Sequence, residues 1–211
     1  MSDIDNRWVP KGESSEDASK LIWSTKSINE LLLALDQGYR PSVSMPFYEG
    51  KQFLRRGNIV FEYTNLEISE LAKCAKDIVY FADNYAVVMT DNGVQQVVLR
   101  DYQKQMLRDF QNNRFNIVLA SRQMGKTVTA SIFNAWYLAF NYDKTTLLLA
   151  NKSESTKEII DKAKVVLENL PFFMKPGIIK YDVMNVRADN GCRLVGQSTT
   201  AKSGIGFTIH N

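Results

Sequence analysis

The chain has 211 residues, of which 45% are apolar, enough for one hydrophobic core with at most a small appendage. Its formal charge of +3 is compatible with a nucleic-acid partner without demonstrating one. The single histidine, His210, argues against a histidine-based metal cluster or a Ser-His-Asp triad, and the distant Cys74 and Cys192 indicate neither a disulfide framework nor a zinc site.

The N-terminal part of the chain predicts a polar arm followed by a short helix. Residues 1–24 lack hydrophobic periodicity and predict a flexible arm. Ser27 and Glu30 have the spacing of a capping box, and the helix that follows should end at Gly38. Prolines and glycines interrupt residues 39–58, so we expect a connection with little strand structure there.

A second helix is expected after Thr64. Thr64 and Glu67 repeat the capping-box spacing, and the apolar positions predict a helix that runs to about Phe81. Together with the first helix it would form a small α-rich subdomain over residues 25–83. The buried face of the second helix should consist of Leu66, Leu71, Ala75, Ile78 and Val79.

Residues Tyr85–Arg100 predict a β-hairpin. Two β-prone runs flank Asn92 and Gly93, a pair typical of a type I′ turn, in which both central residues need a positive φ. Residues 101–112 then predict an amphipathic helix. Its apolar side carries Tyr102, Met106, Leu107 and Phe110.

The next segment has the pattern of a phosphate-binding loop between a strand and a helix. Asn116–Ala120 (NIVLA) suits a buried parallel strand, and Val128–Phe140 is apolar almost all round, as in a helix packed on a sheet. Between them, residues 120–127 read ASRQMGKT, a phosphate loop whose first glycine is replaced by alanine. The structural alternative is an ordinary strand-to-helix turn with an exposed lysine.

Three residues of this loop have the chemistry to bind Mg-ATP. Gly125 lets the backbone approach an anion, and Lys126, the leading catalytic residue, would bridge the β- and γ-phosphates. Thr127 would supply a hydroxyl to Mg²⁺; its alternative is a capping bond at the helix start. Arg122, the second catalytic candidate, would fold over the γ-phosphate, point toward a neighbouring subunit or DNA, or be solvated. Further nucleotide contacts are expected from Ser121, Gln123, Met124 and Val128, and the alternative for Gln123 and Met124 is that they only fill the loop.

Tyr102 and Gln103 are candidates for binding the base. An amide presents both a donor and an acceptor to an adenine edge, and a tyrosine ring can pack on the base. Their position upstream of a phosphate loop favours this interpretation. The alternative places Gln103 on a helix surface and Tyr102 in the core.

The segment after the loop helix predicts the opening of a parallel α/β sheet. Thr145–Ala150 reads as a second buried strand, and Ser155 with Glu158 predicts the start of another helix. The order strand, loop, helix, strand, helix is typical of a parallel sheet with right-handed crossovers. The apolar face of that last helix should be Ile159, Ala163, Val166, Leu167 and Leu170.

A second hairpin is expected near the end of the sequence. Tyr181–Ala188 and Cys192–Gln197 flank Asn190 and Gly191, which again have turn chemistry. A polar loop follows, and residues 207–209 would begin a further strand.

Two basic stretches, Lys152–Lys164 and Lys175–Lys202, are candidates for contact with a phosphate backbone. Acidic or apolar residues interrupt both of them. Solvated charges are therefore the alternative for most of these side chains.

Three of the motifs resemble a known family. YFADNYAVVMTDNG, LRDYQKQML and IVLASRQMGKT are similar to the ATPase domain of large terminase subunits of tailed bacteriophages, from about Tyr80 to the end. The resemblance implies a RecA-like ATPase joined to an RNase H-like nuclease, which pumps double-stranded viral DNA into a procapsid. It also implies ATP and Mg²⁺ as cofactors, with Lys126 and Thr127 as ligands, Arg122 as a trigger and Gln103 as the adenine reader.

Further implications of the resemblance concern partners and location. It implies a portal protein, a small terminase subunit and a homo-oligomeric ring on the procapsid, in the host cytoplasm. No membrane contact is expected, because no apolar run has the length of a membrane span. Residues 202–206 read KSGIG, where the family usually has an Arg-Gly pair.

Residues 84–211 would be the N-terminal part of a P-loop ATPase domain. Such ATPases need a strand that ends in adjacent acids, which position Mg²⁺ and orient the attacking water. No Asp-Glu pair follows an apolar run in this sequence. We therefore expect a fragment whose sheet lacks its central strands and whose hydrolysis is weak or absent, with the acids shortly beyond Asn211.

The expected fold class is α/β, an incomplete RecA-like P-loop core with flanking helices and β-hairpins. Two alternative functions are a helicase-like DNA translocase, which also places a glutamine before its phosphate loop, and a non-enzymatic nucleotide- or protein-binding module. In the latter, the α-rich N-terminal part would be the contact surface.

Overall fold

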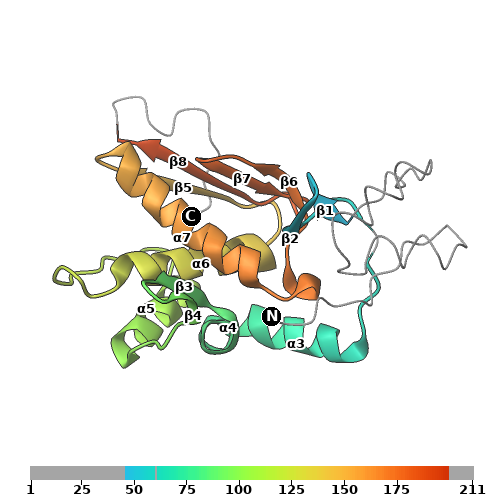
Figure 1. Ribbon diagram of the computed structural model, residues 1–211. Helices are drawn as coiled ribbons and strands as arrows, with labels where there is room; N and C mark the ends of the chain where they lie inside the picture. Colours follow the sequence, from blue (N-terminus) through green and yellow to red (C-terminus); the bar gives the residue numbers. More distant parts are fainter. Residues whose placement is uncertain (1–45, 60, 200–211) are drawn as a thin grey trace, which may run out of the picture.

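The computed structural model describes residues 46–59 and 61–199 (Figure 1). The arm at 1–24, the helix expected after Ser27 and the strand expected at 207–209 lie outside these residues. The described elements are β1 Phe47–Tyr48, β2 Lys51–Arg55, α3 Asn65–Lys76, α4 Ile78–Tyr85, β3 Val87–Thr90, β4 Gly93–Gln96, α5 Asp101–Asn112, α6 Lys126–Phe140, β5 Thr145–Ala150, α7 Ser153–Asn169, the 3₁₀ helix η1 Phe172–Met174, β6 Ile178–Tyr181, β7 Asn185–Ala188 and β8 Arg193–Ser198.

The largest sheet is mixed rather than parallel, with the strand order β5-β8-β7-β6. β5 and β8 pair in parallel, whereas β8, β7 and β6 pair antiparallel. The predicted hairpin at Asn190 and Gly191 is confirmed, and β6 extends it to three strands. The expected parallel sheet holds only for β5 and β8. These two strands have the helix α7 between them, as a parallel pair requires, whereas short turns join β6, β7 and β8 and dictate antiparallel pairing.

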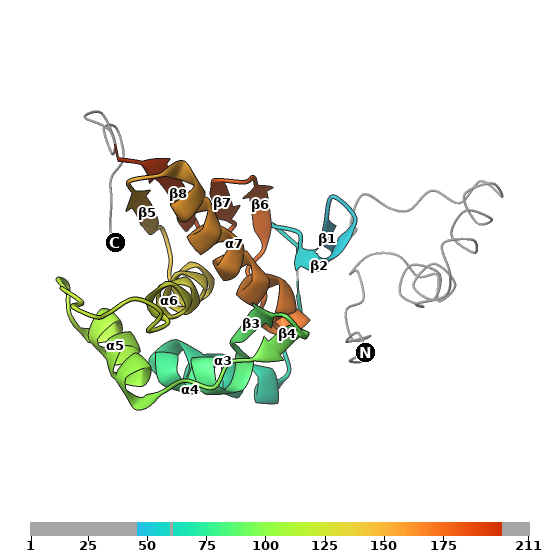
Figure 2. The same ribbon diagram turned by 60° about the vertical axis from the view of Figure 1, so that its left-hand side comes forward.

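The helices lie on one side of this sheet, below it in both ribbon views (Figures 1 and 2). α7 approaches β8 closely because Gly196 has no side chain: a Cβ there would come within 2.6 Å of Thr156 and of Ile160. α6 and α7 meet at Ser131, whose hydroxyl lies 2.8 Å from the Thr127 carbonyl oxygen and 3.0 Å from that of Ile159. The helix that follows the loop, α6, therefore packs on α7, and α7 packs on the sheet.

The capping box predicted at Thr64 is confirmed. The Glu67 N–H donates to the Thr64 hydroxyl at 3.3 Å, and the Glu67 carboxylate accepts from the Thr64 N–H at 2.7 Å. The single helix expected to run to Phe81 is wrong, because Asp77 starts a new one. Its carboxylate accepts from the N–H groups of Val79 and Tyr80, which caps α4.

The buried face of these two helices differs from the expected one. Cys74, Ile78 and Val79 are buried, but Leu66 is 83% exposed and Ala75 is exposed as well. The side-chain N–H of Trp136 on α6 donates to the Cys74 carbonyl oxygen at 2.8 Å. This buried bond joins α3 to the helix that follows the loop.

A short hairpin, β1 and β2, occupies part of the stretch where little strand structure was expected. Glu49 and Gly50 form its turn with φ of 50° and 74°. β2 is anchored from below, since the Lys175 ammonium donates to the Phe53 carbonyl oxygen at 2.8 Å and to that of Glu168 at the end of α7. The expectation for residues 39–58 was therefore wrong at 47–55.

The predicted hairpin β3–β4 is confirmed, but its turn is not type I′. Thr90 pairs with Gly93, so the loop residues are Asp91 and Asn92. Only Gly93 is left-handed, with φ of 93°, and Asn92 keeps a negative φ. The two turn residues are therefore one position earlier in the sequence than predicted. One left-handed residue, Gly93, is enough to close the turn.

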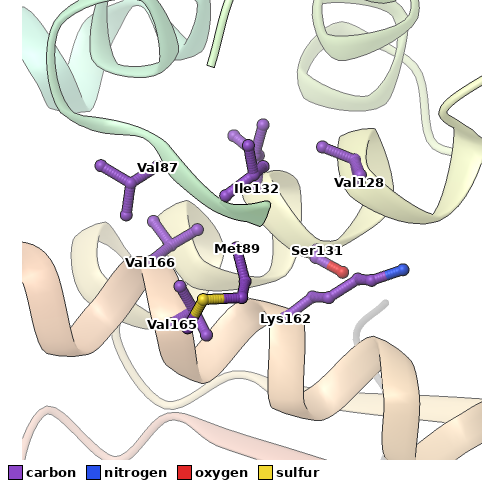
Figure 3. Close-up of a pocket in the computed structure, with 9 residues that line it drawn as sticks. Val87, Met89, Val128, Ser131, Ile132, Lys162, Val165 and Val166 are labelled. Atoms are coloured by element: carbon purple, nitrogen blue, oxygen red, sulfur yellow. The ribbon is translucent and has the colours of Figure 1, made fainter. Parts of the chain in front are cut away.

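This hairpin packs across α6 and α7 around a small cavity of about 30 Å³. Figure 3 shows side chains of all three elements converging there. The lining is mostly apolar: Val87, Val88, Met89, Val128, Ser131, Ile132, Lys162, Val165 and Val166.

The buried strand expected at Asn116–Ala120 is wrong for this structure. The segment has no strand structure, Ile117 and Leu119 are 100% exposed, and Val118 is 41% exposed. A strand needs a neighbour for its backbone N–H and C=O groups, and no described strand pairs with this segment. The segment that leads into the phosphate-loop motif is thus extended and is not paired with a described strand.

Candidate nucleotide site

The phosphate-loop motif forms a turn that leads directly into α6. Gly125 immediately precedes the helix and is left-handed, with φ of 68° and ψ of 17°. The helix starts at Lys126 rather than at the expected Val128, so Thr127 lies in its first turn. Backbone N–H groups of a first turn have no partner within the helix, and they carry partial positive charge. The loop therefore presents the features that bind an anion at a helix start.

The position of Gly125 also depends on Gln103 of α5. A Cβ at residue 125 would lie 2.4 Å from the side-chain nitrogen of Gln103. That amide donates to the Thr129 hydroxyl at 3.4 Å, and the side-chain carbonyl accepts from the Arg100 N–H at 3.0 Å. Gln103 is 8% exposed, so in this structure it supports the loop from behind.

Thr129 is a loop-supporting residue that the sequence analysis missed. It is fully buried, and its hydroxyl donates to the Gly125 carbonyl oxygen at 3.1 Å. The signal in the sequence is its spacing, because a hydroxyl four residues after Gly125 can reach back along the helix.

Lys126 holds its ammonium over the loop. It donates to the carbonyl oxygens of Ala120 at 2.9 Å and of Ser121 at 2.5 Å. A phosphate group at the helix start would compete with these oxygens for the ammonium. The lysine is thus poised beside the anion position that its motif predicts.

The remaining predicted residues surround this turn. Tyr102 donates from its hydroxyl to the Met124 carbonyl oxygen at 3.1 Å and is 39% exposed. Arg122 and Gln123 are exposed, and Gln123 is left-handed, with φ of 63°. Within the described residues, the Thr127 hydroxyl has no hydrogen-bond partner. The structure therefore brings Tyr102 and Gln103 to the loop, and base binding by them stays a prediction.

A pocket of about 560 Å³ opens between α5 and the extended approach to the loop. Tyr102, Met106 and Asp109 repeat along the facing side of α5, and Lys126 lies at the loop end of the pocket. Its full lining is Tyr102, Gln105, Met106, Asp109, Asn116, Ile117, Val118, Leu119, Ala120, Ser121, Met124 and Lys126. Apolar walls with a few polar groups are typical of a small-molecule site.

Other kinds of site find no support in the part of the chain that the structure describes. It holds no group of three or more His, Cys, Asp or Glu residues arranged to bind a metal ion. None of its helices is both long and apolar enough to cross a membrane.

The loop lies within a segment that matches a known family. Residues 117–211 match the family described as terminase large subunit, T4likevirus-type, N-terminal. Over these residues, the chain is similar to the N-terminal part of T4-type large terminase subunits. The terminase match covers α6, β5, α7 and the strands β6 to β8, and it begins just before the loop. Tyr102 and Gln103 lie outside it, although the resemblance was expected from about Tyr80.

This similarity indicates a general role in phage DNA packaging. It favours a packaging protein over the helicase-like translocase.

Proposed function

We propose that this chain binds Mg-ATP at residues 120–127 and is part of the ATPase motor that packages double-stranded DNA into a procapsid. The observation that carries the proposal is the left-handed Gly125 at the start of α6, followed by Lys126 and Thr127 within the terminase match. A RecA-like P-loop core belongs to the same proposal.

Each loop residue has a role in this proposal. The N–H groups at the start of α6 bind the β-phosphate, and Lys126 moves from its carbonyl partners to bridge the β- and γ-phosphates. The Thr127 hydroxyl is a ligand of Mg²⁺. Ser121, Gln123, Met124 and Val128 complete the contacts. Arg122 is exposed and can reach a γ-phosphate, a neighbouring subunit or DNA.

The base is proposed to occupy the pocket beside α5. Tyr102 borders both the pocket and the loop, so its ring can pack on a base whose phosphates lie at Lys126. Gln103 stays a predicted adenine-binding residue, but its contacts here are those of a support for Gly125.

Hydrolysis and assembly extend the proposal beyond the described residues. Phosphoryl transfer to water needs carboxylates that position Mg²⁺ and orient the water, and we place these outside the described residues. A portal protein, a small terminase subunit and a ring of identical subunits are the proposed partners, and the host cytoplasm is the proposed location.

Binding of Mg-ATP to the wild-type chain and to Lys126→Ala tests the proposal. Loss of a charge-assisted bond to phosphate costs about 1.5–3 kcal/mol, so Kd should rise roughly 10- to 100-fold. Lys76→Ala, an exposed lysine on α3, is the matched control and should leave Kd unchanged.

Wild-type affinity no better than that of Lys126→Ala would show that the loop does not bind nucleotide. ATP turnover is measured on the same samples. Turnover by the wild type that the substitution abolishes would instead show that this chain itself supplies the catalytic carboxylates.

A further inference from the structure

Three basic side chains form a row across the antiparallel part of the sheet. Arg187 on β7 is directly opposite Arg193 on β8, and Lys180 on β6 is directly opposite Arg187. Residues that are directly opposite in neighbouring strands share a face of the sheet. The basic row, Lys180–Arg187–Arg193, therefore crosses three adjacent strands on one face.

This face is the one without helices among the described residues. Val186 and Ala188, the neighbours of Arg187 along β7, are fully buried in the core beneath the sheet. Leu194, next to Arg193, is 1% exposed in the same core. Because side chains alternate along a strand, the basic row points to the opposite side, away from the helices in Figures 1 and 2.

The two arginines are not neutralised within the described residues. Lys180 forms an ion pair with Asp182 at 2.8 Å, but neither Arg187 nor Arg193 has a hydrogen bond or ion pair from its guanidinium there. Like charges directly opposite each other in a sheet are destabilising. A bound anion would remove this cost.

The basic row is remote from the nucleotide site. The turn between β7 and β8 contacts the far end of α6, where the Asn190 side chain donates to the Leu138 carbonyl oxygen at 2.8 Å. The phosphate loop is at the start of this helix, twelve residues before Leu138 and therefore about 18 Å away along its axis. The phosphates of an ATP molecule bound at the loop are therefore too far away to contact the basic row, and its anion must be a different one.

We propose that the basic row binds the phosphate backbone of duplex DNA. Neighbouring strands are about 4.8 Å apart, so the row spans about 10 Å, close to the axial rise of three base pairs. Arginine forks suit phosphate oxygens, and an open sheet face admits the broad surface of a duplex. This inference rests on the DNA-handling part of the proposed function and not on ATP binding.

The test compares binding of a short blunt-ended duplex to the wild type and to the double variant Arg187→Ala/Arg193→Ala over a range of salt concentrations. The variant should bind roughly tenfold more weakly at low salt, and the slope of log K against log salt should shrink by about 1.8, or 0.9 for each lost phosphate contact. Lys76→Ala/Arg108→Ala, which removes two exposed charges from α3 and α5, should bind like the wild type. Arg187→Lys/Arg193→Lys should restore the slope if charge at these positions is what matters.

The proposal would be overturned by an unchanged salt slope in the alanine double variant, or by an equal loss of duplex affinity in the control variant. It would also be overturned if the alanine double variant lost binding to polyglutamate while its binding to the duplex stayed intact. The last result would assign the row to an acidic protein segment. Mg-ATP affinity is measured on every variant and should stay constant. A failure of nucleotide binding is seen with Lys126→Ala, so the two proposals fail separately.

Discussion

At Gly125 the backbone is left-handed, and the missing Cβ leaves room for the Gln103 amide. Both properties require glycine, because another side chain would be strained by the φ of 68° and would collide with that amide. Lys126 follows directly, so its ammonium is fixed above the turn. Gly125 thus sets the turn of the backbone, and Lys126 places its positive charge at the expected phosphate position.

Gln103→Ala separates two roles of this glutamine. Because the amide is buried between Arg100 and Thr129, we expect its loss to loosen the loop and to weaken ATP and GTP binding by the same factor, about fivefold or more for roughly 1 kcal/mol. Affinities for both nucleotides are the measurement, with Gln95→Ala, an exposed glutamine on β4 outside the pocket, as the control. A loss confined to ATP would show that Gln103 reads adenine, as its motif predicted.

At the scale of elements, Lys175 joins β2 to the end of α7. Burial lowers the pKa of Lys175 from 10.5 to about 8. Between these values the unfolded chain holds a proton that the folded chain has lost, so the contribution of Lys175 to the free energy of unfolding rises with pH. Below about pH 8 both states are protonated, and the buried charge carries its full cost.

Lys175→Met should therefore destabilise the protein more at high pH than at neutral pH. The substitution leaves the carbonyl oxygens of Phe53 and Glu168 without their donor, at a cost of about 1–3 kcal/mol. Denaturant unfolding at several pH values checks this, with Lys76→Met as an exposed control. A difference from wild type that shrinks between pH 8 and pH 10 would contradict the account.

Local signals predicted several elements well. The capping box at Thr64 and the turn near Gly93 act over a few residues, and the structure contains both. Asp77 was missed as a cap because it lies inside a continuous apolar pattern. The hairpin β1–β2 was missed because its strands are short and lack a clear alternation of apolar and polar residues.

Whether Asn116–Ala120 forms a strand could not be decided from its composition alone. The apolar run satisfies the requirement for burial, but a strand also needs a neighbour to receive its hydrogen bonds. Such a neighbour depends on contacts far along the sequence. In the described residues β5 is an edge strand, and the segment stays exposed.

For the whole molecule, the separation between the two proposed anion sites follows from topology. The phosphate loop was recognisable from the sequence because its residues are consecutive, whereas Thr129 and the basic row depend on helix spacing and strand register. The helices lie on one side of the sheet and leave the row open (Figure 2), and the turn between β7 and β8 contacts the end of α6 that is far from the phosphate loop. In the two proposals, the nucleotide binds at the start of α6 and the duplex binds on the sheet face opposite the helices.

The central claim is that nucleotide phosphates bind at the start of α6. Nuclear magnetic resonance of the ¹⁵N-labelled chain during titration with Mg-ATP measures this directly, because each backbone N–H reports its own surroundings. We predict that the largest shifts fall on Gly125, Lys126 and Thr127 and that Lys126→Ala reduces them. Saturating Mg-ATP that leaves these three resonances in place, or shifts only residues elsewhere, would contradict the claim.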